Sequence, residues 1–296
     1  MDKFWLAPLR GYTNKEYRYA LTKNFQGLES CCMPFISVTE NFNVNFKKYE
    51  HNFTDDELHF KNNYKLVVQL IGKSPTALAG FTEMLCDNGF CNVNLNLGCP
   101  MPQITRKMRG SGLLPHVDVI RQILDNVLRI DDVKFSLKVR LGFKNNHDLL
   151  NMTEMLNDYP LDCVIIHPRT ATDMYDGKLD TEMMKEVVKL LKHKVIYNGD
   201  IVDNESFTKA KSQFPTIDTF MIGRGLLYKP FLLEELLQGY DHGYDERIEK
   251  FQVFYDDLLA AMANNQNLKS HVKAYWHYFK DLYKDGEERY KVIVRS

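Results

Sequence analysis

Eight short β-rich segments, separated by amphipathic helical patterns, predict an α/β protein: a (β/α)8 TIM barrel followed by a small all-helical C-terminal domain. Polar residues fall at the ends of most of these segments, which is where active sites lie in this fold. An open, doubly wound sheet is the competing architecture. The placement of the polar residues favours the barrel.

The predicted strands follow one another along the chain and are rich in Val, Ile, Leu and Phe. Between them, apolar residues recur at helical spacing, for example at Ile120, Ile123 and Val127. Parallel strands need crossover connections of this kind. The predicted strands are Phe4–Pro8, Cys31–Val38, Lys65–Ile71, Cys91–Leu97, Lys134–Arg140, Cys163–His167, Lys194–Asn198 and Asp218–Gly223.

The pattern changes near residue 240, after which only helical periodicity is visible, in Phe251–Met262 and Leu268–Tyr283. We therefore predict a barrel domain over residues 1–240 and a helical domain over residues 241–296. The second domain interleaves basic and aromatic residues, such as Lys273 and Trp276. Two interpretations stay open, a helical hairpin that caps the barrel and a domain that grips RNA.

The composition is that of a globular protein with a large core. Hydrophobic residues make up 44% of the 296 residues. No apolar run approaches the roughly 18 residues that a membrane span needs, and the first residues do not resemble a signal peptide. We therefore expect a cytoplasmic protein with no membrane association, and no stable protein partner is predicted.

The net charge and the cysteine pattern exclude further classes of protein and of binding site. The net charge is −1, from 38 Lys and Arg against 39 Asp and Glu. A dedicated nucleic-acid coat would be strongly basic, so any RNA partner must be met by a local patch. The six cysteines include no CxxC pair and no secretion signal accompanies them, so neither a disulfide framework nor a metal site is expected.

Side chains that can carry chemistry lie at the ends of six predicted strands. Keeping a buried lysine charged costs several kcal/mol unless an anion pairs with it. Lys138 and Arg140 point to the same side of their strand because side chains alternate. One such residue alone is more often structural, but six strand ends together predict a site. The residues are Gln69, Asn96, Lys138, Arg140, His167, Asn198, Asp200 and Arg224.

The last two predicted strands indicate a phosphorylated ligand. Gly199, Gly223 and Gly225 would let backbone N–H groups approach a ligand closely, and Arg224 offers a charge-assisted fork. Loops after the seventh and eighth strands are the usual phosphate site in this fold. An ordinary glycine turn at residues 223–225 is the alternative.

Cys99 lies between Gly98 and Pro100, on a sharply shaped loop after the fourth predicted strand. A partly exposed thiol near Arg and Lys can act as a nucleophile or as a proton donor. A buried packing thiol is the alternative.

The segment Asn94–Pro100 resembles the signature of the dihydrouridine synthase family, in which an Asn-x-Gly-Cys-Pro segment carries the catalytic cysteine. Further pieces of the family pattern follow in order over about residues 3–235. They are Ala7-Pro8-Leu9, Val68-Gln69-Leu70, Leu137–Gly142, His167-x-Arg169 with Tyr175-x-Gly177, Asn198–Ile201 and Ile222–Gly225.

The resemblance implies FMN as the cofactor, NADPH as the reductant and uridine in tRNA as the substrate. It implies that Cys99 is the general acid. A local basic patch for RNA would comprise Arg106, Lys107, Arg109, Lys273 and Lys280, and ordinary solvated charge is the alternative for all five. The residues that would address the uracil are Asn96, Arg140, Arg169 and Tyr175. The residues that would hold FMN are Pro8, Gln69, Lys138, His167, Asn198, Gly199, Asp200, Gly223 and Arg224.

Other functions compete with this one. An FMN-dependent enzyme of the dihydropyrimidine or dihydroorotate dehydrogenase type would act on a free base and would need neither the helical domain nor the basic patch. A non-catalytic RNA-binding protein would not need Cys99 or Lys138. A flavin-free isomerase of phosphorylated sugars would be colourless when purified.

Overall fold

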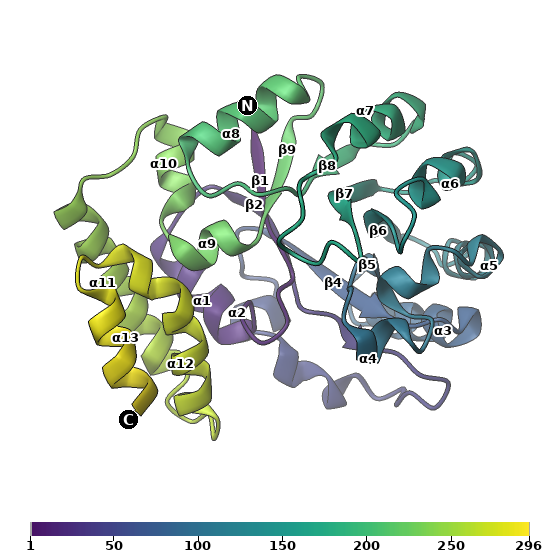
Figure 1. Cartoon of the computed structure of the whole chain (residues 1–296). Coiled ribbons are helices and arrows are strands. Elements are labelled where there is room, and N and C mark those ends of the chain that lie inside the picture. Colours follow the sequence, from purple (N-terminus) through teal and green to yellow (C-terminus); the bar gives the residue numbers. More distant parts are fainter. Residues whose placement is uncertain (1, 296) are drawn as a thin grey trace.

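The computed structural model describes residues 2–295 and has a barrel of parallel strands at its centre (Figure 1). One nine-stranded sheet runs in the order β2-β1-β9-β8-β7-β6-β5-β4-β3, and β2 also pairs with β4. That extra pairing closes the sheet, so the (β/α)8 prediction is confirmed. The strands are β1 (Lys3–Leu6), β2 (Leu28–Cys32), β3 (Ile36–Ser37), β4 (Lys65–Ile71), β5 (Asn92–Leu97), β6 (Lys134–Gly142), β7 (Cys163–Thr170), β8 (Val195–Tyr197) and β9 (Thr219–Ile222).

The prediction of a single strand over Cys31–Val38 is wrong, because the structure has two short strands in this region. They are β2 and β3, separated by residues 33–35. Pro34 lies in this break, and proline cannot donate a hydrogen bond to a ladder. β2 pairs with the beginning of β4 and β3 pairs with its end, through Ile36 opposite Leu70. The second barrel position is therefore filled by a broken strand whose gap faces the mouth of the barrel.

Helices surround the barrel because each buries one apolar face against the strands (Figure 1). In α5 the buried residues are Ile120, Ile123, Leu124 and Val127, as the helical spacing predicted. None of the helices within residues 2–295 is long and apolar enough to cross a membrane. The barrel helices are α1 (Lys15–Asn24), α2 (Asp55–Leu58), α3 (Pro75–Asp87), α4 (Pro102–Thr105), α5 (Val117–Val127), α6 (Asp148–Leu156), α7 (Thr181–Leu190), α8 (Asn204–Gln213), α9 (Arg224–Tyr228) and α10 (Leu232–Gln238).

The C-terminal segment is helical, with α11 (Tyr244–Ala261), α12 (Leu268–Phe279) and α13 (Gly286–Arg295). It lies against α1 on one side of the barrel, where the ring of Phe254 is 5.4 Å from that of Tyr17 (Figure 1). Trp276 is buried and donates a hydrogen bond to the Tyr255 hydroxyl at 2.8 Å. Part of the basic and aromatic pattern of this segment therefore builds a core and is unavailable to a ligand.

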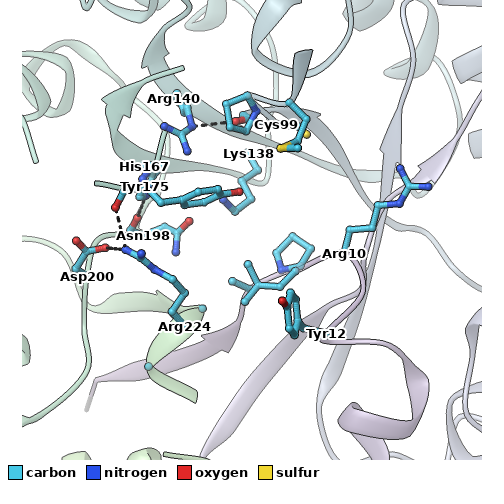
Figure 2. Close-up of a pocket in the computed structure, with 18 of the residues that line it drawn as sticks. Arg10, Tyr12, Cys99, Lys138, Arg140, His167, Tyr175, Asn198, Asp200 and Arg224 are labelled. Atoms are coloured by element: carbon cyan, nitrogen blue, oxygen red, sulfur yellow. Dashed lines mark hydrogen bonds and ion pairs between the residues drawn. The ribbon is translucent and has the colours of Figure 1, made fainter. Parts of the chain in front are cut away.

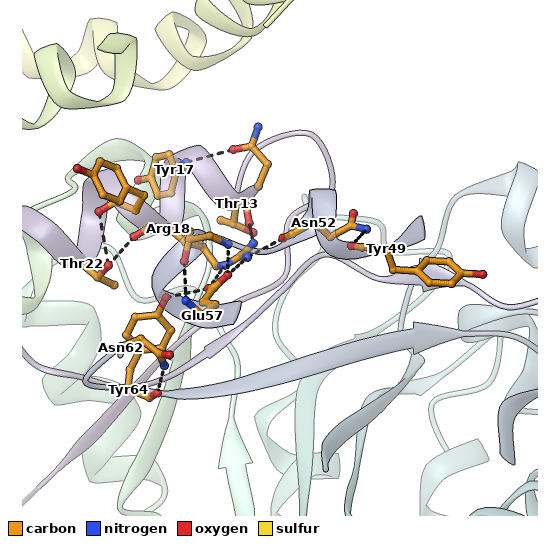
Figure 3. Close-up of polar contacts among 12 residues, drawn as sticks. Thr13, Tyr17, Arg18, Thr22, Tyr49, Asn52, Glu57, Asn62 and Tyr64 are labelled. Atoms are coloured by element: carbon orange, nitrogen blue, oxygen red, sulfur yellow. Dashed lines mark hydrogen bonds and ion pairs between the residues drawn. The ribbon is translucent and has the colours of Figure 1, made fainter. Parts of the chain in front are cut away.

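A buried ion pair fixes the region where α1 meets the β1–α1 loop (Figure 3). The Arg18 guanidinium donates to both carboxylate oxygens of Glu57, at 2.8 and 2.6 Å, and both side chains are almost fully buried. Arg18 also donates to the carbonyls of Thr13 and Asn52. Burial would raise the pKa of Glu57, but the charge and hydrogen bonds of Arg18 keep it below its ordinary value.

Replacing Arg18 with methionine should lower the free energy of unfolding by about 3–5 kcal/mol, because Glu57 would remain buried without a cation. Urea denaturation of the variant and the parent would measure the loss. The control is Lys23→Met, which breaks the exposed Lys23–Asp257 pair and should cost less than about 1 kcal/mol. Equal losses in the two variants would contradict this account.

Candidate functional site

A cavity of about 910 Å³ opens at the carboxyl ends of the barrel strands. Its floor and walls come from the ends of β1, β5, β6, β7, β8 and β9, and α12 contributes His277 and Tyr278 on one side. Figure 2 shows Cys99, Lys138 and Arg140 on one part of its wall and Asp200 and Arg224 on another. The cavity is therefore where this fold usually binds its substrate.

Twelve of the residues singled out from the sequence line this cavity together. They are Pro8, Asn96, Cys99, Lys138, Arg140, His167, Tyr175, Asn198, Gly199, Asp200, Gly223 and Arg224. The structure does not place seven others on the wall. These are Gln69, Arg106, Lys107, Arg109, Arg169, Lys273 and Lys280.

Asn96 and Gln69 form a buried hydrogen-bonded pair below the cavity. The Asn96 amide donates to Oε1 of Gln69 at 2.9 Å, and Gln69 in turn donates to Asn94 at 2.8 Å. Oδ1 of Asn96 accepts from the backbone N–H groups of Gly98 and Cys99, at 3.1 and 2.9 Å. Gln69 is fully buried, and its contacts orient Asn96, which holds the cysteine loop. Its direct contact with a cofactor stays a prediction.

Arg140 holds the same loop from the other side. Its Nε donates to the Gly98 carbonyl at 3.0 Å and its Nη1 to the Thr170 carbonyl at 2.6 Å. The backbone around Cys99 is thus fixed by two side chains from two strands.

The Cys99 thiol is half-buried and faces several cations. Burial raises the pKa of this thiol, and the Met101 N–H with the charges of Arg140, Arg10 and Lys138 offsets only part of the rise. The thiol is therefore protonated at neutral pH. It can act as an acid in the cavity, and it is a poor thiolate nucleophile.

Lys138 points from β6 toward the cavity (Figure 2). Burial, aided by the charge of Arg140, lowers the pKa of Lys138 to about 8. Over residues 2–295, no carboxylate forms an ion pair with it, since the ion pairs of this part of the chain all involve other cations. A buried ammonium without an anion is costly, so Lys138 favours a negatively charged ligand.

His167 is held in one tautomer. Its Nδ1 lies 2.5 Å from the Asn198 carbonyl and must donate to it, so Nε2 is an acceptor that faces Nη1 of Arg169 at 3.3 Å. Burial lowers the pKa of His167 well below its ordinary value, and the charges of Arg140 and Lys138 lower it further. His167 is a neutral hydrogen-bonding residue of the wall.

Asp200 binds two arginines. Its carboxylate accepts from Arg169 at 3.1 and 2.6 Å. It also accepts from Arg224 at 2.9 Å (Figure 2). Burial would raise the pKa of Asp200, but these two arginines hold it below its ordinary value. Asp200 therefore positions Arg224 and also lines the cavity, and its direct contact with a cofactor stays a prediction.

Arg169 is buried behind the wall, where it also donates to the Gly177 carbonyl at 2.5 Å. Its guanidinium binds Asp200, Gly177 and His167, and its contact with the substrate stays a prediction. Tyr175 is different. Its ring is exposed and lies between two guanidiniums, 5.4 Å from Arg140 and 5.6 Å from Arg224.

The glycines after β8 and β9 are required for two different reasons. A Cβ at Gly199 would lie 2.0 Å from the Tyr197 hydroxyl, and one at Gly225 would lie 2.1 Å from the Ile201 carbonyl oxygen. Packing of the protein against itself therefore requires both residues. A Cβ at Gly223 would meet only Ala7 and Leu9 at ordinary contact distances, so Gly223 is the position where glycine leaves room at the cavity wall.

Three of the expected RNA-contacting residues, Arg106, Lys107 and Arg109, follow the cysteine loop outside the cavity. Arg106 and Lys107 are exposed, whereas Arg109 is half-buried and donates to the Ser37 hydroxyl at 3.2 Å. Lys273 is half-buried on α12 and does not reach the wall.

Several wall residues were missed from the sequence, above all Arg10, Tyr12 and Phe35 near β1 and β3, and His277 and Tyr278 on α12. The other site residues were predicted because they are polar and lie at or just after the end of a strand. Arg10 follows the first strand in the same way, so the same criterion identifies it. No local signal marks His277 or Tyr278, because only packing brings α12 to the mouth. The ring of Tyr278 lies 5.3 Å from that of Tyr12.

Comparison with known proteins places the chain in a family. The dihydrouridine synthase (Dus) family matches residues 5–293 of the chain. The tRNA-dihydrouridine synthase B of Pasteurella multocida (strain Pm70) is 29% identical over 242 residues, which cover 80% of this chain and 70% of that protein. The protein of the same name from Escherichia coli (strain K12) is 27% identical over 239 residues, 80% of this chain and 72% of that protein.

Among solved structures, morphinone reductase superposes with a TM-score of 0.56 at 11% identity, over 81% of this chain and 86% of that one. That likeness shows a shared barrel fold. The match to the family extends over nearly the whole described chain and includes the cysteine loop, the lysine strand and the α12 wall. The chain belongs to the dihydrouridine synthase family.

Proposed function

We propose that this protein is a tRNA dihydrouridine synthase that uses FMN and NADPH to reduce the C5–C6 double bond of uridines in tRNA. The observation that carries the proposal is a protonated thiol, Cys99, on the same cavity as Lys138, a cation without a carboxylate partner in the described chain. Membership of the dihydrouridine synthase family and the names of the related proteins support the reaction and the RNA substrate.

The cavity fits a flavin mononucleotide in size and in chemistry. Lys138 would face the electron-rich edge of the ring system, and apolar residues such as Ala7, Pro8 and Ile201 would cover its faces. The phosphate would lie near Gly223 and Arg224. Nη2 of Arg224 is engaged by Asp200 and by the Tyr175 carbonyl, which orients the guanidinium and leaves Nη1 and Nε for a ligand.

A bound reduced flavin would supply the hydride for C6 of the uracil. Cys99 would donate its proton to C5 from the opposite face, which its raised pKa favours. Arg140, fixed by two backbone carbonyls, would place positive charge near the uracil oxygens where negative charge develops. Tyr175, flanked by two arginines, would stack on a ring that enters the cavity.

The target base must leave its stack in the RNA to enter such a cavity. α12 borders the mouth through His277 and Tyr278, and the exposed Arg106 and Lys107 follow the cysteine loop outside it. Both would contact the rest of the RNA. An enzyme of a free base would need neither feature, which disfavours the dihydroorotate dehydrogenase-like alternative.

The test is nucleoside mass spectrometry of tRNA from a strain that lacks the gene, beside its parent, with the purified protein added back. We expect dihydrouridine to be lost at one or a few positions and restored by the protein with NADPH. The purified protein should be yellow. Unchanged tRNA in the deletion strain, with activity on free uracil or dihydroorotate, would refute the proposal in favour of the free-base alternative.

Replacing Arg224 with alanine should weaken FMN retention by about tenfold or more, because a charge-assisted contact to the phosphate is lost. Flavin absorbance after exhaustive dialysis would measure the occupancy. The control is Arg289→Ala, an exposed arginine paired with Asp285 on α13. Full occupancy in the Arg224 variant would remove this residue from the phosphate site.

A further inference from the structure

Two residues that no sequence motif marked, Arg10 and Phe35, form part of the cavity rim next to Cys99. Arg10 lies in the β1–α1 loop and its guanidinium carbon is 5.2 Å from the centre of the Phe35 ring. Building on the proposed function, we propose that Arg10 binds a backbone phosphate of the RNA beside the target uridine. Phe35 holds its guanidinium flat for that contact.

The loop that carries Arg10 is held in place. The Thr13 hydroxyl accepts from the Leu9 N–H at 2.8 Å and donates to the Ala7 carbonyl at 3.1 Å, so it bridges the two ends of the turn. Gly11 makes the turn with a φ of +86°, and Arg18 donates to the Thr13 carbonyl from the buried pair in Figure 3. A side chain on such a loop is presented to a ligand with little loss of backbone entropy.

No carboxylate of the described chain neutralises the charge of Arg10. Arg10 is exposed and, over residues 2–295, forms no ion pair with a carboxylate. Its neighbours along the rim are also cationic, since Arg109 donates to Ser37, two residues after Phe35. The exposed Arg106 and Lys107 shortly precede Arg109 in the chain. The net charge of the whole protein is −1, so this cluster of cations is a local feature of the surface. It attracts an anionic ligand to this side of the cavity.

The position of Arg10 separates its ligand from the cofactor. In Figure 2, Arg10 lies on the side of Cys99, and Asp200 and Arg224 lie across the cavity. The FMN phosphate belongs with Arg224, so Arg10 is left for the second ligand. A guanidinium offers paired N–H donors to phosphate oxygens, and phosphate contacts fix the register of a nucleic acid without reading its sequence. A nucleotide turned into the cavity brings its own flanking phosphates to this rim.

The test compares flavin-loaded wild type with Arg10→Ala and Arg10→Lys in fluorescence anisotropy titrations of tRNA at several salt concentrations. We expect the alanine variant to bind tRNA about tenfold more weakly. We also expect its slope of log affinity against log salt to be shallower by about 1. The lysine variant should keep most of the slope, because the charge remains. The rate at which NADPH reduces the bound flavin should be unchanged in both.

Arg129→Ala is the matched control, an exposed arginine that borders a different cavity beside α3 and α5 and should leave affinity and slope unchanged. Unchanged affinity and slope in Arg10→Ala would overturn the inference. A raised KM for NADPH with normal tRNA binding would also overturn it, by assigning Arg10 to the phosphates of the reductant. The two failures are distinguishable, since a wild-type protein that makes no dihydrouridine refutes the proposed function instead.

Discussion

The Cys99→Ala variant is expected to keep its flavin and its NADPH oxidation and to reduce uridine about 10²- to 10⁴-fold more slowly, the usual contribution of a positioned acid. The thiol lines the cavity, and Asn96 and Arg140 fix its backbone, so the methyl side chain should leave the loop unchanged. Single-turnover reduction of tRNA by pre-reduced enzyme would isolate this step from flavin reduction.

Cys91→Ala is the matched control, because Cys91 is another half-buried thiol that borders the cavity beside α3 and α5. Its variant should reduce tRNA at the parental rate. If the Cys99 variant also did so, the thiol would not be the acid.

The pH dependence of the same step tests the protonation state. Because the protonated thiol is the active form, the rate should be constant at low pH and fall as the pH rises through the Cys99 pKa. That pKa lies above the ordinary value, since burial dominates. The fall should therefore come at higher pH than for a solvent-exposed thiol, and the alanine variant should lose it.

The Lys138→Met variant is expected to lose most of its flavin-dependent activity and yet to be more stable without flavin. At neutral pH the native ligand-free protein holds the Lys138 charge in a site that lowers its pKa to about 8. Replacing that charge with an apolar chain of similar length should raise the free energy of unfolding by on the order of 2 kcal/mol. With flavin present, the variant should bind and reduce it poorly, since the cation beside the cofactor is gone.

The sign of the pH effect follows from the lowered pKa. Between pH 8 and about 10.5 the unfolded chain keeps the lysine proton and the native protein has released it, so the stability of ligand-free wild type should rise over this range. Urea denaturation at pH 7 and near pH 10 would measure the rise relative to Lys138→Met, which lacks it. The control is Lys134→Met, at the exposed start of the same strand. Equal stability of Lys138→Met and wild type at neutral pH would contradict the burial of an unpaired charge.

The sequence alone predicted the barrel and twelve residues of the cavity wall. Alternation along β6 predicted that Lys138 and Arg140 share a side, and both line the cavity. Helical spacing predicted the buried face of α5. These inferences succeeded because strand and helix periods are local properties, and because parallel strands in a closed barrel bring all their carboxyl ends to one mouth.

Which partner each polar side chain takes was decided only by the tertiary structure. The sequence predicted ligand binding by Arg169, Asp200 and Asn96 without showing their partners in the protein. In the structure Arg169 binds Asp200, Asp200 binds Arg224, and Asn96 binds the cysteine loop, because buried polar groups find hydrogen-bond partners wherever these lie in the chain. The broken strand at Pro34 was decided by pairing of β2 and β3 with different ends of β4.

The residues at the rim of the cavity were also determined by the tertiary structure. His277 and Tyr278 reach the mouth because α12 packs beside α9. Arg10 faces Phe35 because Arg10 follows β1, Phe35 follows β2, and these two strands are paired. The sequence by itself determined the elements, the direction of their side chains and the edge at which they converge, since these depend on neighbours a few residues apart. Contacts between segments far apart in the chain depend on how whole elements pack, so only the folded structure determined them.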